Sequence, residues 1–245
     1  MNFRFRIFLS LGVALSLHVP AGAEDVPEGF TPLFNGKDLS GWFGRKTEDP
    51  VKLTEMATEE LKAHKESTLE DIHAHWTVVD GVLHNDGKGL YLTTDKNYAD
   101  FELRLEYKTV PLADSGIYLR GVPQVQIWDS TEEKKFKLGA NKGSGGLWNN
   151  KDMPGKDPLV LADKPFGEWN QMSITMVGEY VTVYLNGKLV VDHAKMRNYF
   201  KPREPIYESG PIQLQTHGGE ISWRNIYIRE YSEMEAKAYL ALKGE

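Results

Sequence analysis

Apolar and polar residues alternate through most of the chain after Phe30, in short runs separated by turn residues. The segment FELRLEYKTV (101–110) is typical, with apolar or aromatic residues at its odd positions up to 107 and charged residues at its even positions up to 108. A period of two residues indicates a β-strand with one face buried and the other exposed. The chain therefore reads as a series of short strands.

Tight turns between these runs predict antiparallel neighbours. Asp80-Gly81 lies inside WTVVDGVLHNDG (76–87), and Asn186-Gly187 separates two further alternating runs, with another turn expected at Gly178-Glu179. Asp-Gly and Asn-Gly favour two-residue type I′ turns, which require positive φ. The segments GPIQLQTHGG (210–219) and ISWRNIYIRE (221–230) complete the series. This spacing predicts an all-β fold in which two antiparallel sheets form a jelly-roll sandwich with one concave face.

Two helices interrupt the strand pattern. Residues 53–64, LTEMATEELKAH, are strong helix formers, and we expect a helical insertion over about residues 51–66, before the first hairpin. The tail SEMEAKAYLALKG predicts a C-terminal helix over about residues 231–244, with Ser232 as its N-cap and Gly244 at its end.

The N-terminus has the three parts of a secretory signal. Arg4 and Arg6 precede an apolar stretch over residues 7–19, and Ala21-Gly22-Ala23 follows as a small-residue cleavage site. We predict a signal peptide at 1–23, cleavage after Ala23, one jelly-roll domain at 24–245, and a periplasmic or secreted protein. A buried N-terminal strand is the alternative. The apolar stretch is too short to span a bilayer and no second one follows, so no membrane association is expected after cleavage.

Composition narrows the classes of function. The 245 residues include no cysteine, which excludes a disulfide scaffold and thiolate chemistry. The formal net charge is −6, and loss of Arg4 and Arg6 with the signal makes it −8. Without a basic stripe, an acidic surface argues against nucleic acid as a partner.

Large polar side chains occupy the outward positions of several strands. If the strands pair in one sheet, one patch holds carboxylates, amides, a guanidinium, an imidazole and aromatic rings. Sugars require this mixture, because their hydroxyls need planar hydrogen-bonding partners and their C–H faces need aromatic platforms. A solvated strand surface remains the alternative for any single glutamine. The outward groups are Glu102, Arg104 and Glu106; Tyr118 and Arg120; Gln124, Gln126 and Trp128; and Gln213, Gln215 and His217.

Nine ordered segments resemble the bacterial 3-keto-disaccharide hydrolase family over roughly residues 30–230. They are LFNGKDLSGW, WTVVDGVL, DFELRLEYK, DSGIYLRG, VQIWD, GEWNQMSI, LNGKLVVD, IQLQTHG and WRNIYIR. The resemblance implies a concanavalin A-like jelly roll, export, and cleavage of glycosides oxidised at sugar C3. Members of that family often carry Glu at the position of Gln124, and this departure raises the alternative of a non-catalytic carbohydrate-binding module.

The implied reaction needs an acid, a base and donors for an enolate oxygen. His217 suits proton exchange near neutral pH, Glu106 or Asp129 could be its partner, and Arg120 suits the oxyanion. Asp129 equally suits a turn cap, and Arg120 could simply pair with Glu106. The expected substrate contacts are Glu102, Tyr118, Gln124, Gln126, Trp128, Gln213 and Gln215, together with Trp148 from the Gly-rich loop NKGSGGLWNN (141–150).

No cofactor is required by the sequence, and a divalent metal that polarises the ketone remains open. His73 and His75 would share a face in an extended segment, yet no third ligand has matching spacing, which favours a plain helix-to-strand connection. A retaining jelly-roll glucanase is rejected, because QVQIWD supplies only Asp129, out of phase with Gln124 and Gln126. The expected partner is an oxidised di- or oligosaccharide.

Overall fold

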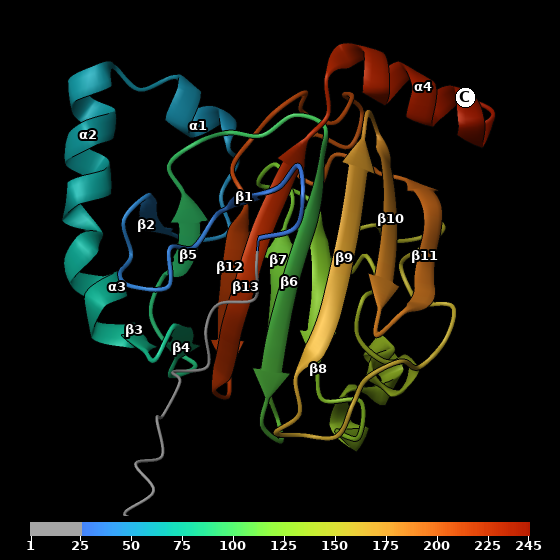
Figure 1. Ribbon diagram of the computed structural model, residues 1–245, viewed down its shortest axis with the longest axis horizontal. Coiled ribbons are helices and arrows are strands. Elements are labelled where there is room, and N and C mark those ends of the chain that lie inside the picture. The colour runs from blue at the N-terminus through green and yellow to red at the C-terminus, as the bar shows by residue number, and fades with distance from the viewer. Residues whose placement is uncertain (1–25) are drawn as a thin grey trace, which may run out of the picture.

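Two antiparallel β-sheets face each other in the computed structural model, which describes residues 26–245 (Figure 1). Sheet A has the strand order β11-β10-β9-β6-β13-β4-β3, with β1 beside β13, and sheet B has the order β2-β5-β12-β7-β8. The predicted all-β sandwich is confirmed. Sheet A contains β1 (Thr31–Pro32), β3 (Trp76–Val79), β4 (Val82–Asn85), β6 (Phe101–Thr109), β9 (Asn170–Val177), β10 (Tyr180–Leu185), β11 (Lys188–Lys195) and β13 (Ile221–Glu230). Sheet B contains β2 (Trp42–Arg45), β5 (Tyr91–Thr94), β7 (Asp114–Tyr118), β8 (Gln124–Trp128) and β12 (Gln213–Gly218).

The predicted turns join the sheet A hairpins. Asp80 and Gly81 have φ of 51° and 79° between β3 and β4, and Asn186 and Gly187 have φ of 50° and 76° between β10 and β11. Positive φ at both central residues is the requirement of a type I′ turn, and Asp-Gly and Asn-Gly meet it at low cost.

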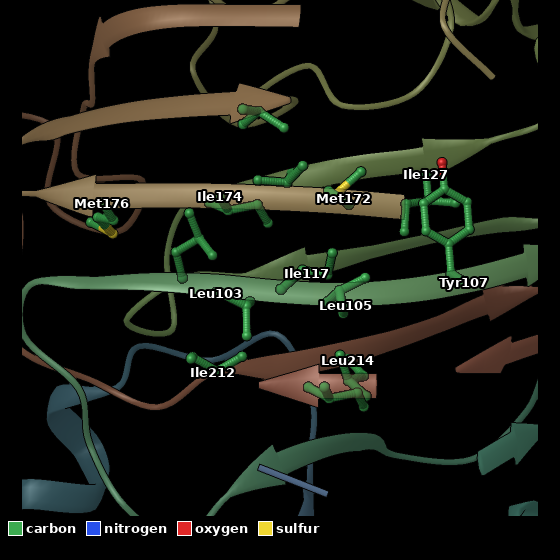
Figure 2. Close-up of a cluster of buried hydrophobic side chains, with 14 of the residues drawn as sticks. Leu103, Leu105, Tyr107, Ile117, Ile127, Met172, Ile174, Met176, Ile212 and Leu214 are labelled. Carbon is green, nitrogen blue, oxygen red and sulfur yellow. The ribbon is translucent and has the colours of Figure 1, made fainter. Parts of the chain in front are cut away.

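The core lies between the two sheets and is built from the inward residues of each strand. Figure 2 shows Leu103 and Leu105 of β6 beside Ile174 of β9, with Ile117 and Leu214 of sheet B in the same cluster. These side chains are at most 2% exposed. Burying one large aliphatic side chain contributes about 1.5–3 kcal/mol, so this layer supplies much of the stability of a chain without disulfides.

The helices lie at the borders of the sandwich. The insertion contains α1 (Val51–Thr54), α2 (Thr58–Ser67) and α3 (Leu69–His75), and so runs nine residues beyond its predicted end. It extends because Ile72 of α3 is fully buried in the core. The C-terminal helix α4 (Glu233–Lys243) is confirmed, with a capping box between Ser232 and Glu235 and left-handed Gly244 at its end.

Two short 3₁₀ helices, η1 (Glu133–Leu138) and η2 (Ala140–Lys142), connect β8 to the Gly-rich loop. Within residues 26–245, no helix combines the length and apolar character needed to cross a membrane. The predicted signal peptide lies outside the described residues and stays a prediction, as does the domain boundary at residue 24.

Candidate functional site

Three of the four predicted polar groups, apart from Arg120, lie on one face of sheet B. Strand β7 pairs with both β8 and β12, so Tyr118 lies between Gln124 and Gln213, and Gly116 lies between Gln126 and Gln215. Directly paired residues of neighbouring strands point to the same side of a sheet. We call this outward side of sheet B the polar face. Strands β5 and β2 extend it with Tyr91, Thr93, Phe43 and Arg45.

The fourth group lies elsewhere, and its predicted place in the patch is wrong. Glu102 and Glu106 belong to β6, which is a central strand of sheet A, and they point away from the core toward the opposite surface of the sandwich. Glu106 is held by Arg224 and by Gln171, and Glu102 pairs with Arg104. Packed sheets are about 10 Å apart, so Glu106 cannot be the partner of His217 and Glu102 cannot contact the same sugar.

Arg120 is a buried structural residue, and its predicted oxyanion role is wrong. It follows β7 with φ of 52° and is 2% exposed. All three guanidinium nitrogens donate hydrogen bonds, and Nη2 pairs with Asp100 Oδ1 at 2.7 Å. Its burial reflects a role in joining loops from different parts of the chain. The other acceptors are the carbonyl oxygens of Ala99, Gly178 and Tyr207.

Asp129 caps the turn after β8, which is the alternative that the sequence left open. Its carboxylate accepts from the Leu112 N–H at 2.9 Å and from the Thr131 N–H and hydroxyl at 2.7 and 2.6 Å. Burial opposes its ionisation, but the hydrogen bonds from Thr131 and Leu112 outweigh burial and lower the pKa of Asp129. A carboxylate committed to a turn in this way is a poor acid–base group.

The glutamines of the polar face form one connected amide network. Gln124 Nε2 donates to Gln215 Oε1 at 2.6 Å and to Gln126 Oε1 at 2.8 Å. Gln126 Nε2 donates in turn to Asp114 Oδ1 at 2.8 Å, while Gln215 Nε2 reaches the Tyr91 hydroxyl at 3.3 Å. The three glutamines are only 3–5% exposed. They therefore bind one another and do not present free amides to a sugar.

The remaining predicted contacts at this end of the face are also buried. Gln213 donates to the Thr93 hydroxyl at 3.0 Å and is fully buried. Tyr118 stacks on Tyr91 with ring centroids 5.9 Å apart, and its hydroxyl lies 3.3 Å from that of Thr47. Burial raises the pKa of Tyr118 to about 12. The predicted contacts in this half of the polar face are thus buried, and the most exposed of the predicted side chains on this face, His217, lies at the other end.

That accessible end is formed by His217 and Asp114. The pairing of β12 with β7 shifts register between Thr216 and Gly218, and His217 is the extra residue of this bulge. Bulges redirect a side chain at the end of a strand. Here His217 Nδ1 lies 3.2 Å from Asp114 Oδ2, with the His217 side chain 61% exposed and that of Asp114 12% exposed.

The electrostatics of the pair favour a charged carboxylate beside a readily protonated imidazole. The hydrogen bond to Asp114 raises the pKa of His217 above its usual value, against an opposing effect of burial. Burial works against ionised Asp114, but hydrogen bonds from His217 and Lys135 prevail and lower the pKa of that carboxyl. Lys135, from η1, lies 3.0 Å from Asp114 Oδ2 and 2.8 Å from Glu132.

Asp114 and Lys135 were missed by sequence reasoning. Asp114 opens the segment DSGIYLRG and shares parity with Tyr118, so extending the alternation four residues toward the N-terminus would have found it. Lys135 comes from a loop helix that no strand pattern could locate. Arg45 was missed too. It lies opposite Tyr91 in the pairing of β2 with β5, and its Nη2 donates to the Asp49 carbonyl oxygen at 2.7 Å. Burial lowers the pKa of Arg45.

Two tryptophans border this accessible end. Backbone hydrogen bonds pair the Gly-rich loop with β8, including one from the Trp148 N–H to the Gln124 carbonyl at 3.0 Å. Trp148 therefore meets Trp128 edge to face, with ring centroids 5.4 Å apart, and the Lys156 ammonium lies 5.0 Å from the Trp148 ring centre. Trp148 is partly exposed. The loop thus places Trp148 against Trp128, the residue that pairs with Asp114, while the predicted contact of Trp148 with substrate stays a prediction.

The two early histidines form no chelating pair. His73 and His75 both lie in α3, where residues two apart point about 200° away from each other. His75 is hydrogen-bonded to the Asp86 carboxylate at 3.0 Å. Across residues 26–245, no cluster of three or more His, Asp or Glu side chains has the arrangement of a metal site.

Known structures share this sandwich. A candidate glycosyl hydrolase from Parabacteroides distasonis superposes with a TM-score of 0.59 at 21% identity, over 84% of this chain and 95% of that one. A second from the same organism has a TM-score of 0.53 at 28% identity, over 64% of this chain and 91% of the other. The fold is thus that of a class of two-sheet sandwich proteins that includes these two structures.

The sequence comparison is more specific. The profile of the 3-keto-alpha-glucoside-1,2-lyase-like domain matches residues 29–229, and the chain belongs to that family. A 3-keto-disaccharide hydrolase from Bacteroides thetaiotaomicron is 24% identical over 258 aligned positions, which cover 87% of this chain and 81% of that protein. The resemblance drawn from nine sequence segments is confirmed, and the family supports a carbohydrate-active enzyme.

Proposed function

We propose that this protein cleaves glycosides that carry a ketone at C3, by elimination followed by hydration, with the His217–Asp114 pair transferring the protons. The observation that carries the proposal is this exposed imidazole, fixed by a buried carboxylate at the open end of the polar face. The family and the Bacteroides relative support the substrate class.

The chemistry follows from the ketone. The C3 carbonyl acidifies the C2 hydrogen, so a base can take that proton while the electron pair moves onto the C3 oxygen as an enolate. The C1–O bond then breaks, leaving a C1=C2 double bond conjugated with the C3 ketone, and the leaving oxygen takes a proton. Water adds at C1 and a proton returns to C2. Each proton movement needs a group that exchanges protons near neutral pH.

His217 fits this requirement through the orientation of its ring. The Nδ1–H donates to Asp114, which leaves Nε2 as the acceptor in the neutral imidazole. Asp114 then stabilises the imidazolium that forms when His217 takes the C2 proton. That imidazolium can return its proton to the leaving oxygen. The Asp114 carboxylate also accepts a hydrogen bond from Gln126. The amide network therefore fixes the carboxylate, and the carboxylate fixes the orientation of the His217 ring.

Lys135 takes the role first assigned to Arg120. Its ammonium and the His217 ring contact the same oxygen of Asp114, so they lie on one side of the site. Burial disfavours its charge, but hydrogen bonds to Glu132 and Asp114 prevail and raise the pKa of Lys135. A persistent ammonium with a third N–H is suited to stabilise the enolate oxygen. Trp148 and Trp128 supply an aromatic border for the sugar ring.

Turnover of a synthetic 3-keto-glucoside tests the proposal, with the unoxidised parent glucoside as control. We expect cleavage of the oxidised compound alone, and a fall in kcat of about 10²-fold or more in His217→Ala and His217→Gln. KM should change much less, because proton transfer occurs on the way to the transition state. Full turnover in both variants would remove His217 from the mechanism.

A carbohydrate-binding module is the second candidate, favoured by Gln124. Its amide nitrogen donates to Gln126 and Gln215, and an amide cannot transfer a proton as a carboxyl group does. Binding of the 3-keto-glucoside with no turnover by the wild-type protein would establish that alternative. We also propose export to the periplasm or medium, which predicts Glu24 as the first residue of the mature protein; an intact Met1 on cytoplasmic material would exclude it.

A further inference from the structure

A hollow of about 430 Å³ lies on the outer face of sheet A, on the opposite side of the sandwich from the polar face. We call it the sheet A hollow. Its volume falls within the range of about 300–1,000 Å³ usual for small-ligand sites. Strands β13, β6, β9 and β10 supply most of its lining, which includes Arg104, Glu106, Gln171, Ser173 and Tyr184.

The polar groups of the hollow are those that bind sugar hydroxyls. Strand pairing places Arg104 beside Ser173, and Glu106 beside Gln171, on this outer face. Gln171 Nε2 donates to Glu106 Oε1 at 3.0 Å, which orients both side chains. Tyr184, paired with Ser173, borders the hollow with 45% of its surface exposed. An exposed aromatic ring beside oriented amide, hydroxyl and carboxylate groups matches the C–H and O–H surfaces of a pyranose.

The charges of the hollow select a neutral ligand. Arg104 pairs with Glu102 at 2.7 Å, and Glu106 pairs with Arg224. Each charge in or beside the hollow is therefore compensated within the protein, so an anionic or cationic ligand would gain little. Glu106 is paired with Arg224 and no histidine lines the hollow, so we expect binding there without acid–base chemistry.

We propose that the sheet A hollow is a second, non-catalytic carbohydrate site, which binds one or two neutral, unoxidised pyranose units. This second site goes beyond the proposed function, since its ligand needs no ketone and its binding does not involve His217. The core separates it from the polar face, so both sites can be occupied together. A glycan held here would raise the effective concentration of nearby oxidised ends at His217.

An NMR titration of the isotope-labelled mature protein with maltose, cellobiose and sucrose tests this proposal. These sugars lack the ketone and so report binding alone. We expect saturable shifts at the amides of Gln171 and Ser173, and a loss of affinity of about 3- to 10-fold in Tyr184→Ala. Ser173→Trp, which fills the hollow, should abolish the shifts, and the dispersion of its spectrum verifies that it folds.

Two controls separate this site from the polar face. Phe166→Ala removes an aromatic ring of similar exposure (39%) outside the hollow and should leave binding unchanged. His217→Ala should bind the same sugars as the wild type, whatever it does to turnover. The proposal is overturned if no sugar gives saturable shifts, if the shifts map to the polar face and vanish in His217→Ala, or if Tyr184→Ala and Ser173→Trp bind like wild type.

Discussion

Replacing Gln124 by Glu tests whether the amide network has the orientation that the structure shows. The Gln124 nitrogen donates two short hydrogen bonds, to Gln126 and Gln215, and is 3% exposed. A carboxylate at the same place would face two acceptor oxygens without any donor. Burial and this lack of donors both disfavour the charged form, so the pKa of the introduced carboxyl should be raised above about 4.3.

The size of the effect depends on how many of these two hydrogen bonds the new side chain can still make. In its protonated form it can donate to one of the two oxygens, and the absence of the other hydrogen bond costs about 1–2 kcal/mol. In the charged form the variant loses about 1.4 kcal/mol more of folding stability for each unit by which folding raises the pKa of the carboxyl group introduced at position 124. We therefore expect a destabilisation of about 1–2 kcal/mol near pH 4 that grows to about 3–5 kcal/mol at pH 8.

The sign of the pH dependence distinguishes this substitution from a simple loss of packing. Because the folded-state pKa lies above the unfolded one, the folded state binds more protons between the two values, and relative stability falls as pH rises. Urea unfolding of Gln124→Glu and wild type at several pH values measures the difference. Gln124→Met, which removes the donors without adding a charge, is the matched control and should show a constant deficit.

A stability deficit of Gln124→Glu relative to wild type that is the same at pH 8 as at pH 4 would refute the reasoning. It would mean that Gln126 and Gln215 can turn their amides to donate toward position 124, so that the network has two equivalent orientations. The Gln124→Met control keeps the two explanations apart, because its deficit does not depend on any titration.

Two further changes probe the site and the core. Asp114→Asn should lower turnover of a 3-keto-glucoside. It should also move the part of the pH–rate profile that reflects His217 titration to lower pH, because the carboxylate raises the pKa of that imidazole. An NMR titration of the His217 ring should shift in the same direction, and an unchanged pH–rate profile would assign that titration to another group. Leu214→Ala should cost about 2–5 kcal/mol in urea unfolding, since this side chain is fully buried between the sheets, whereas a loss below about 1 kcal/mol would mean that the core repacks around it.

Local features of the fold were predictable because their causes lie within a few residues. The type I′ turns at Asp80-Gly81 and Asn186-Gly187 need only residues that tolerate positive φ. Helix α4 needs only its Ser232 cap and terminal glycine. The alternation in β6 gave the inward face correctly for the same reason, since side-chain direction in a strand is set by its own backbone.

Which sheet a strand joins was beyond that reasoning. Strand β6 alternates like β7 and β12, yet it pairs with β9 and β13, so Glu106 and His217 lie on opposite surfaces. Partner choice depends on contacts far apart in sequence, which alternation does not encode. The prediction for Arg120 was wrong for a related reason. Beyond the end of β7 the backbone at Arg120 has positive φ, so the alternation of the strand no longer gives the direction of its side chain.

The buried glutamines change what the polar face does for the site. A face of open amides would bind a sugar directly, but here the hydrogen bonds run from Gln215 through Gln124 and Gln126 to Asp114. The last acceptor in that series is the carboxylate that holds His217, the one member of the series with most of its side chain exposed. Long side chains fixed in this way lose little further conformational entropy when substrate binds. In the proposed function, the amides are the rigid support of one titratable group, and the bulge in β12 places that group where it is exposed for substrate.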